Sequence, residues 1–352
     1  MKASGNKTMK NAVRLTLSLG MSALFLWIAF RGVDFATLTA ALRNIHMEYV
    51  GLYVVTLVFI QFARAFRWDI LIRPFARVDF RALMRISNLG NMLIMVLPLR
   101  LGELARPYLL KREAGARITA GMGAVVVERA IDGLLVTLLF FLTTYDLGEP
   151  YHVPQALRVG AFVALGIFAG ATAVIGLALA THGWVPRMLR RLGGSIAPGL
   201  TEKLVHMLDA FVSGLRSLPD VRSVAIVVFW TLAYWAANAL GLFWVARAFG
   251  WDLPFVAGFT VVCVVVIGIM IPAGPGFLGT YQGAIIAGLS IYGINKTDAL
   301  AFSLVAYPIN LAVVVGFGLP YLFGRNHVEV GEIVRASAEG EDAEASEAPP
   351  GK

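Results

Sequence analysis

The chain has 352 residues, of which 58% are hydrophobic and only 15% are charged. A soluble domain carries about 25% charged residues, so this composition excludes an ordinary soluble protein and indicates a helical membrane protein. No polar stretch is long enough to form a separate soluble domain. We therefore expect one membrane domain over residues 1–325, followed by a tail over residues 326–352.

The formal net charge of +8 is unevenly distributed along the chain. The tail holds seven acids and two bases, which leaves 28 bases and 15 acids, a net charge of +13, in the membrane domain. A basic excess in a membrane protein marks cytoplasmic loops and also attracts anionic lipid head groups. The tail is rich in Glu, Ala, Ser, Gly and Pro, which predicts a disordered segment.

The first apolar run, from Leu15 to Phe30, follows four basic residues and predicts an uncleaved span over about 12–30 whose N-terminus lies in the cytoplasm. A segment over 34–46 is expected outside the membrane or at its interface, and a second span over about 48–66 follows. Six arginines within residues 64–85 place the next stretch in the cytoplasm. The arginines at the inner end of the second span, Arg67 among them, are interpreted mainly as charges that set the topology, with contact to a lipid phosphate as the alternative role of Arg67 and Arg73.

Residues 86–117 begin with about a dozen apolar residues, which is too short a run to cross a bilayer. The run breaks at Pro98 and Gly102, and several basic residues then indicate a return to the cytoplasmic side. Irregular backbone at membrane depth is tolerated only where protein or a water-filled cavity satisfies it. We predict a re-entrant hairpin that enters from the inside.

The third and fourth spans are predicted over about 119–145 and 157–181. The loop between them has Asp146, Glu149 and His152 and no Lys or Arg before Arg158, which places it outside. Residues 183–222 are basic and therefore inside. An amphipathic stretch near 200–217 is expected to lie on the membrane surface. The fifth span covers about 223–246.

The run over 254–293 repeats the pattern of the first hairpin and is expected to dip in from the outside. Its break is made of prolines and glycines and is followed by a glutamine: Pro272, Gly274, Pro275, Gly276, Gly279 and Gln282. A last span over about 298–323 brings the C-terminus to the cytoplasmic side. Pro98 and Pro272 are 174 residues apart, which is close to half of the membrane domain.

These elements predict an all-α membrane protein with about six full spans and two re-entrant hairpins. The second half, over about 147–325, would repeat the first half, over about 1–146, with inverted topology. Broken segments at matching places in two halves point to the binding site of a transporter. If residues 254–272 and 276–293 cross the membrane completely, the chain has eight spans and the same orientation of its ends.

Three ionisable residues, Glu128, Arg129 and Asp132, lie inside the predicted third span, where each costs about 2.5–3.5 kcal/mol. Glu128 and Asp132 share a helical face, and Arg129 can pair with Asp132. Two interpretations stay open. The charges form a buried salt bridge that ties the span to a hairpin, or they line a substrate path, where they face a cation or carry protons.

The first break is followed by Arg100, Glu103 and Arg106, which lie three residues apart and so roughly on one helical face. A helix N-terminus and two guanidinium groups suit phosphate oxygens, so we expect these residues, with Arg67 and Asn91, to bind a lipid phosphate. In the alternative interpretation, Arg106 marks the cytoplasmic end and pairs with Glu103.

The second break lacks a basic residue, so it offers backbone groups and polar side chains such as that of Gln282, or else it is a packing corner between hairpin arms. The single cysteine, Cys263, excludes an intrachain disulfide and a cysteine-based metal site. The five histidines are scattered, and no P-loop, dinucleotide fingerprint or nucleophile elbow is present. We therefore expect no metal, no cofactor, no nucleic-acid partner and no enzymatic activity.

Five motifs, taken in order, resemble the lysylphosphatidylglycerol synthase transmembrane family of flippase-like (UPF0104-type) membrane proteins: Arg64-Ala-Phe-Arg67-Trp68, Gly90-Asn91, Leu97-Pro98 through Arg106-Pro107, Glu128-Arg129-Ala-Ile-Asp132, and Pro272 through Gln282. The resemblance extends to about Phe323 and implies a helical domain that binds or moves polar lipids. In the fused synthases this domain is thought to flip an aminoacylated lipid, and a soluble transferase domain follows it. Only 29 residues follow Phe323 here, so we expect that catalytic part to be absent. Many members carry Glu where Gln282 stands, which weakens the case for a carboxylate role there.

We therefore expect a translocator of a phosphate-bearing polar lipid or lipid-linked intermediate in the cytoplasmic membrane of a bacterium. The high content of Ala, Gly and Arg is the basis for the bacterial assignment. The alternative is a non-transporting protein that presents a lipid to a separate glycosyl- or aminoacyl-transferase. A small-solute carrier fits the arginine-rich cytoplasmic face less well.

Overall fold

The computed structural model describes residues 20, 23–97, 102–145, 151–180, 184–193, 198–199, 201–202, 205, 221–270 and 275–323. Most of the predicted first span, the stretch near 200–217 and the acidic tail lie outside the described residues. Within them the chain is helical and contains no strand. The helices are α2 (Phe35–Arg43), α3 (Met47–Ile72), α4 (Phe80–Val96), α5 (Ala105–Ala114), α6 (Ile118–Thr144), α7 (Gln155–Ala180), α8 (Trp184–Gly193), α10 (Val221–Ala248), α11 (Val256–Ile269), the 3-10 turn η2 (Pro275–Phe277), α12 (Thr280–Ser290), α13 (Lys296–Gly318) and α14 (Pro320–Phe323).

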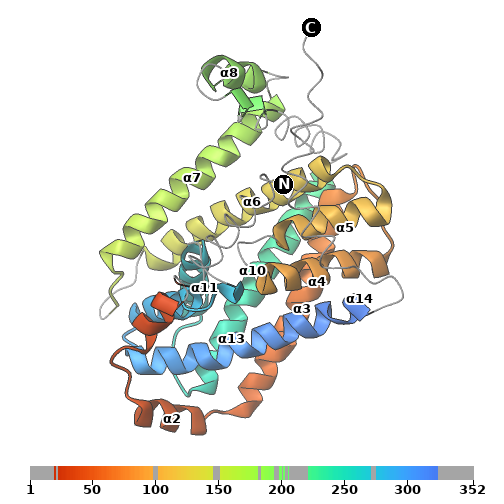
Figure 1. Cartoon of the computed structure of the whole chain (residues 1–352). Helices are drawn as coiled ribbons and strands as arrows, with labels where there is room; N and C mark the ends of the chain where they lie inside the picture. Colours follow the sequence, from red (N-terminus) through yellow and green to blue (C-terminus); the bar gives the residue numbers. More distant parts are fainter. Residues whose placement is uncertain are drawn as a thin grey trace, which may run out of the picture.

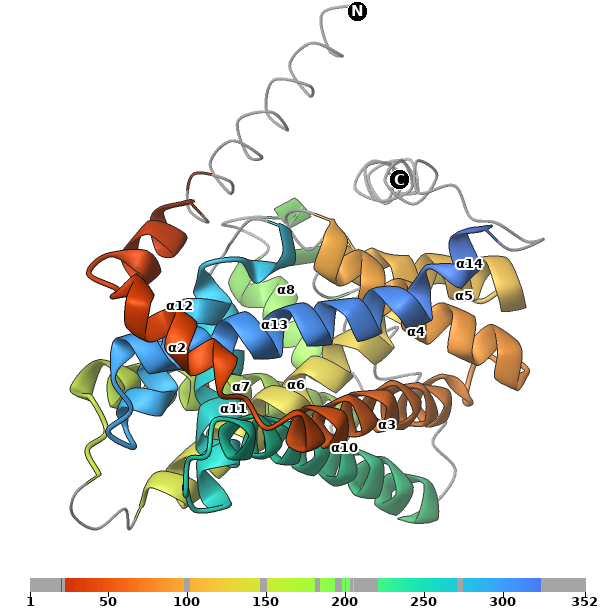
Figure 2. The same cartoon turned by 90° about the horizontal axis from the view of Figure 1, so that it is seen from below.

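Two long helices, α3 and α10, lie side by side along the length of the molecule (Figure 2). Aromatic pairs join them near both ends. Tyr49 stacks on Trp244 with ring centroids 5.9 Å apart, and Phe66 stacks on Trp230 at 5.1 Å. Each helix exceeds the roughly 20 residues that a membrane crossing requires, with 26 residues in α3 and 28 in α10.

Four helical segments are long and apolar enough to cross a membrane, and they lie in α3, α7, α10 and the α13–α14 region. A fifth is counted if residues 23–30 and α2, which are bent by 88°, form one span. Helix α6 has 27 residues, enough for about 40 Å, but three charges interrupt its apolar sequence. The prediction of a multi-pass helical membrane protein is confirmed.

Each of the two breaks separates a pair of short helices that pack against each other, α4 with α5 and α11 with α12. In addition, α4 contacts α13, and α11 contacts α6. Pro98, Arg100, Pro272 and Gly274 lie outside the described residues. Gly102 permits the close approach of the first pair, because a Cβ atom at this position would overlap the backbone of α4 at Leu93.

The second break turns at Gly276, whose φ of +71° is a conformation that favours glycine. The Tyr307 hydroxyl of α13 donates a hydrogen bond to the Gly276 carbonyl at 2.8 Å. Gly279 then caps α12, and its N–H donates to the Gln282 Oε1 at 2.7 Å. Gln282 therefore fixes the start of a helix through its side-chain oxygen.

The predicted end of the second span at residue 66 is wrong, because α3 continues to Ile72. The side chains of Ala65, Trp68 and Ile72 are fully buried, so the packed face of the helix runs past its arginines. Arg67 consequently lies inside a helix and not in a cytoplasmic loop. Helix α7 stands at the edge of the molecule beside α6 and exposes most of its apolar side chains (Figure 1).

Candidate functional site

A cavity of about 400 Å³ lies among the long helices and the two broken helix pairs. Its size falls within the range of roughly 300–1,000 Å³ that is typical of small-molecule sites. Its lining comes from α3, α4, α6, α10, α11, α12 and α13, with one residue of α7. Met95 and Glu103 flank the first break and Met270 and Gly276 flank the second, and all four line this cavity. The two breaks therefore face one shared space.

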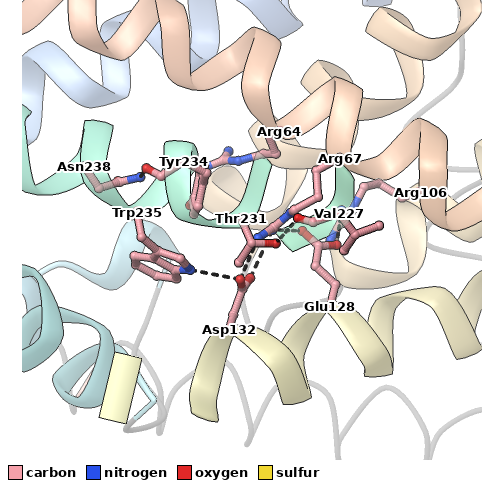
Figure 3. Close-up of polar contacts among 10 residues, drawn as sticks. All are labelled: Arg64, Arg67, Arg106, Glu128, Asp132, Val227, Thr231, Tyr234, Trp235 and Asn238. Atoms are coloured by element: carbon pink, nitrogen blue, oxygen red, sulfur yellow. Dashed lines mark hydrogen bonds and ion pairs between the residues drawn. The ribbon is translucent and has the colours of Figure 1, made fainter. Parts of the chain in front are cut away.

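Arg67 lies at the centre of a buried ion-pair network that extends along one side of the cavity (Figure 3). Its guanidinium donates to both oxygens of Asp132, at 2.5 and 3.0 Å, and to Glu128. Arg106 donates to the other oxygen of Glu128 at 2.7 Å, and the Trp235 indole donates to Asp132 at 2.9 Å. All four oxygens of the two carboxylates thus accept hydrogen bonds.

The network is almost dry, because the side chains of Arg67, Glu128 and Arg106 are 3%, 3% and 1% exposed. Two aromatic rings cover the arginines. Arg67 lies 4.8 Å from the ring centroid of Tyr234, and Arg106 lies 4.5 Å from that of Trp68. Buried charges are tolerated where they are paired and hydrogen-bonded, so this network holds α3, α5, α6 and α10 in one arrangement.

Of the two interpretations of the charges in α6, the structure contains the buried salt bridge, which joins Glu128 of α6 to Arg106 of α5. The pairing of Arg129 with Asp132 is wrong, because Arg67 reaches Asp132 from α3. The interpretation of Arg67 as mainly a topology signal is also wrong, since its charge is buried between two carboxylates. The pairing of Arg106 with Glu103 is not what the structure shows either, because Arg106 is bound to Glu128.

The predicted phosphate ligands occupy different places. Arg106 is fully buried behind Glu128 and does not line the cavity. Gly90 of α4 leaves room for it, because a Cβ atom there would overlap the Arg106 side chain. Asn91 and Glu103 do line the cavity, as does Arg129, and Arg100 lies outside the described residues.

Three further site residues were not predicted from the sequence. Trp235 and Tyr234 of α10 bind the network, and Arg64 of α3 donates from Nη2 to the Tyr234 hydroxyl at 3.0 Å. Trp and Tyr are enriched at membrane interfaces, whereas this pair lies in the middle of a long apolar helix. This position in the sequence could have indicated that the two side chains bind a buried polar group.

No cluster of three or more His, Cys, Asp or Glu side chains that could hold a metal occurs in the described ranges. The polar groups of the cavity lining include guanidinium, carboxylate, amide, phenol and indole groups. This set suits hydrogen bonding and charge pairing with a polar or anionic molecule.

Several curated proteins are similar to this chain. It is 26% identical over 287 residues to the glycosyltransferase AglD of Haloferax volcanii, a match that covers 74% of this chain but only 45% of that protein. It is 22% identical over 332 residues to a UPF0104 membrane protein of Methanothermobacter thermautotrophicus, which covers 89% of this chain and 96% of the relative. A UPF0104 membrane protein of Methanocaldococcus jannaschii is 23% identical over 233 residues, or 66% and 94% of the two chains. No solved structure matches the chain.

A protein family described as the lysylphosphatidylglycerol synthase TM region matches residues 12–318, which is most of the chain. The match includes both broken helix pairs and every residue of the buried network. The chain therefore belongs to the lysylphosphatidylglycerol synthase TM region family of membrane proteins.

Proposed function

We propose that this protein translocates a phosphate-bearing polar lipid or lipid-linked intermediate across a cytoplasmic membrane, and that the head group passes through the central cavity. The observation that carries this proposal is the cavity itself, which combines apolar walls with arginine, carboxylate and amide groups between the two breaks. Such a space can replace the water around a lipid head group while the acyl chains stay in the bilayer.

The contacts of the helices support an inverted repeat. In that arrangement α3 corresponds to α10, the pair α4–α5 to α11–α12, and α6 to α13. The contact of α4 with α13 then has its counterpart in the contact of α11 with α6. A two-fold axis in the membrane plane, with broken helices at the centre, is a known transporter plan.

The proposed topology counts α6 as a span in spite of its charges. The first span, α3, α6, α7, α10 and α13 then cross the membrane, and the two broken pairs are re-entrant hairpins. The arginines in residues 64–85 and 183–222 set the inner side, which places both termini in the cytoplasm. The two carboxylates of α6, Glu128 and Asp132, are compatible with a span because their arginine partners lie inside the protein.

The named residues divide into two groups. Arg67, Arg106, Glu128 and Asp132 hold the helices around the cavity in register, whereas other polar groups of the lining meet the head group. In this proposal the protein has no chemical step of its own.

A second candidate function is the presentation of a lipid to a separate transferase. The observation that favours it is the relative named as a glycosyltransferase, of which this chain matches less than half. Such a protein would bind the lipid in the same cavity without moving it.

The test uses purified protein in liposomes with fluorescent head-group-labelled lipids and a membrane-impermeant quencher. Val266 lines the cavity from α11, so Val266→Trp should fill it and slow the exposure of the inner-leaflet label. Val163 on α7 is 56% exposed, so Val163→Trp is the matched control and should behave as the wild type. Equal rates in all three proteins would contradict a path through the cavity. Binding of the lipid without exposure of the label would favour the second candidate.

A further inference from the structure

Arg129 differs from the other arginines of the site in its surroundings. It lies in the middle of α6 with protein around it, it is exposed, and it lines the cavity. Among the described residues it makes no ion pair and no hydrogen bond through its guanidinium. The carboxylates beside it are already occupied, since Glu128 and Asp132 bind Arg67, Arg106 and Trp235.

The charges around the cavity leave a positive excess. Among the described residues, four arginines and three acids form the charged part of the lining and the network behind it: Arg64, Arg67, Arg106, Arg129, Glu103, Glu128 and Asp132. An uncompensated charge at membrane depth is costly unless water or an anion meets it. One negative charge restores the balance.

Asn91 supplies an independent second observation. Its side chain is 7% exposed, it lines the same cavity from α4, and its Nδ2 group has no hydrogen-bond partner. A buried amide N–H without a partner loses the hydrogen bonds that it would make in water. An acceptor oxygen of a bound molecule would satisfy it.

We propose that Arg129 and Asn91 bind the phosphate of the transported lipid, and that the preferred head group is a singly charged phosphodiester. Guanidinium binds two phosphate oxygens at once, and the amide donates one further hydrogen bond. This assigns direct contact to Arg129 and a positioning role to Arg106, which reaches the site only through Glu128. The inference rests on the proposed function, since it names the substrate chemistry of that cavity.

The test exploits the fact that the chain has one cysteine. Cys263 is buried, so Cys263→Ala gives a background for a single reporter cysteine. Asn238 lines the cavity from α10, and Asn238→Cys places the reporter there. The rates of its modification by an anionic and a cationic methanethiosulfonate reagent of similar size are then compared. We expect the anionic reagent to react faster, by about tenfold, because a nearby guanidinium attracts it.

The ratio of the anionic to the cationic modification rate should fall close to one in Arg129→Gln and stay high in Arg129→Lys. Arg158→Gln is the matched control, because Arg158 is an exposed arginine on α7 that does not line the cavity, and it should keep the preference. Continued reaction with the cationic reagent shows that the variant is folded with an accessible cavity. An unchanged preference in Arg129→Gln would overturn the assignment.

Ligand protection separates the sources of phosphate. Short-chain phosphatidylglycerol should slow the modification of Asn238→Cys, and this protection should be lost in Arg129→Gln and weakened in Asn91→Ala. Glycerol 3-phosphate tests the same chemistry without acyl chains, and protection by it alone would overturn the assignment to a lipid. The assay needs no transport, so protection without translocation would retain this site and reject the translocator. Translocation that survives Arg129→Gln would reject the site and retain the translocator.

Discussion

Glu128 connects its own helix, α6, to both α3 and α5, because each of its carboxylate oxygens binds a different arginine. One oxygen accepts from Arg67 of α3 and the other accepts from Arg106 of α5 at 2.7 Å. Removal of one partner from a buried ion pair typically costs about 3–5 kcal/mol, since it leaves an uncompensated charge. The network is therefore expected to be a main determinant of stability around the cavity.

Replacement of Glu128 tests this expectation. Glu128→Gln should lower the free energy of unfolding by about 3–5 kcal/mol, because two buried arginines lose their shared partner. Thermal or denaturant unfolding in detergent micelles measures the loss. Glu48→Gln is the control, because Glu48 is exposed and pairs only with His46 at 3.3 Å, and it should change stability by less than about 1 kcal/mol.

The double variant Glu128→Gln with Arg106→Gln separates charge pairing from packing. If the pair acts as a unit, the double variant should be less destabilised than the sum of the two single variants. Additive losses would contradict the ion-pair account of these two residues.

Much of the charged cluster could be foreseen from the sequence. Three charges within an apolar run require buried partners, and this argument favours a salt bridge to a hairpin without naming the partner. The structure contains such a bridge between Glu128 and Arg106. The partner Arg67 was missed because an arginine near the end of a span has the same pattern as a topology signal. Sequence spacing shows which residues share a face of a helix, but not which neighbouring helix that face meets. The sequence therefore could not show whether Arg129 or Arg67 pairs with Asp132.

At the scale of elements, the second break depends on backbone conformations with positive φ, at Gly276, Phe277 and Gly279. Gly276 has a φ of +71°, and a Cβ atom at this position would overlap the Tyr307 hydroxyl. The same hydroxyl donates to the Gly276 carbonyl at 2.8 Å. The glycine therefore joins the broken pair α11–α12 to α13.

Gly276→Ala should be destabilising by about 1–2 kcal/mol or more, because it adds the cost of the left-handed conformation to the overlap with Tyr307. Gly283→Ala is the matched control in α12, where open space surrounds the glycine, and it should be neutral or stabilising by up to about 1 kcal/mol. Unfolding in micelles distinguishes the two variants. Tyr307→Phe should partly rescue Gly276→Ala, since it removes the overlapping oxygen, and equal effects of the two glycine variants would contradict this account.

The elements themselves were largely predictable. The apolar runs gave α6, α7, α10 and α13 to within a few residues, because the length of such a run follows from the thickness of the bilayer. The expected short segment after the first span appears as α2, bent by 88° from the helix before it. The end of α3 was misjudged, because arginines were taken to end a span although buried partners allow them to lie inside one.

At the scale of the whole molecule, the two broken pairs and the central pair α3–α10 enclose one cavity. The sequence predicted that the breaks share a site, because they recur at the same place in each half. It could not predict which residues line the cavity, since the lining comes from segments far apart in the chain, and the sequence of one segment does not show which face of another it meets.

Accessibility of the cavity from both sides of the membrane tests the central claim most directly. Asn310 lines the cavity from α13, so Asn310→Cys in the Cys263→Ala background reports on this space. Ser290→Cys, at an exposed position at the end of α12, is the control and should react from one side only. In right-side-out and inside-out membrane vesicles, we predict that a membrane-impermeant thiol reagent modifies Asn310→Cys from both sides. Modification from one side alone, or from neither, would contradict a translocation path through the cavity.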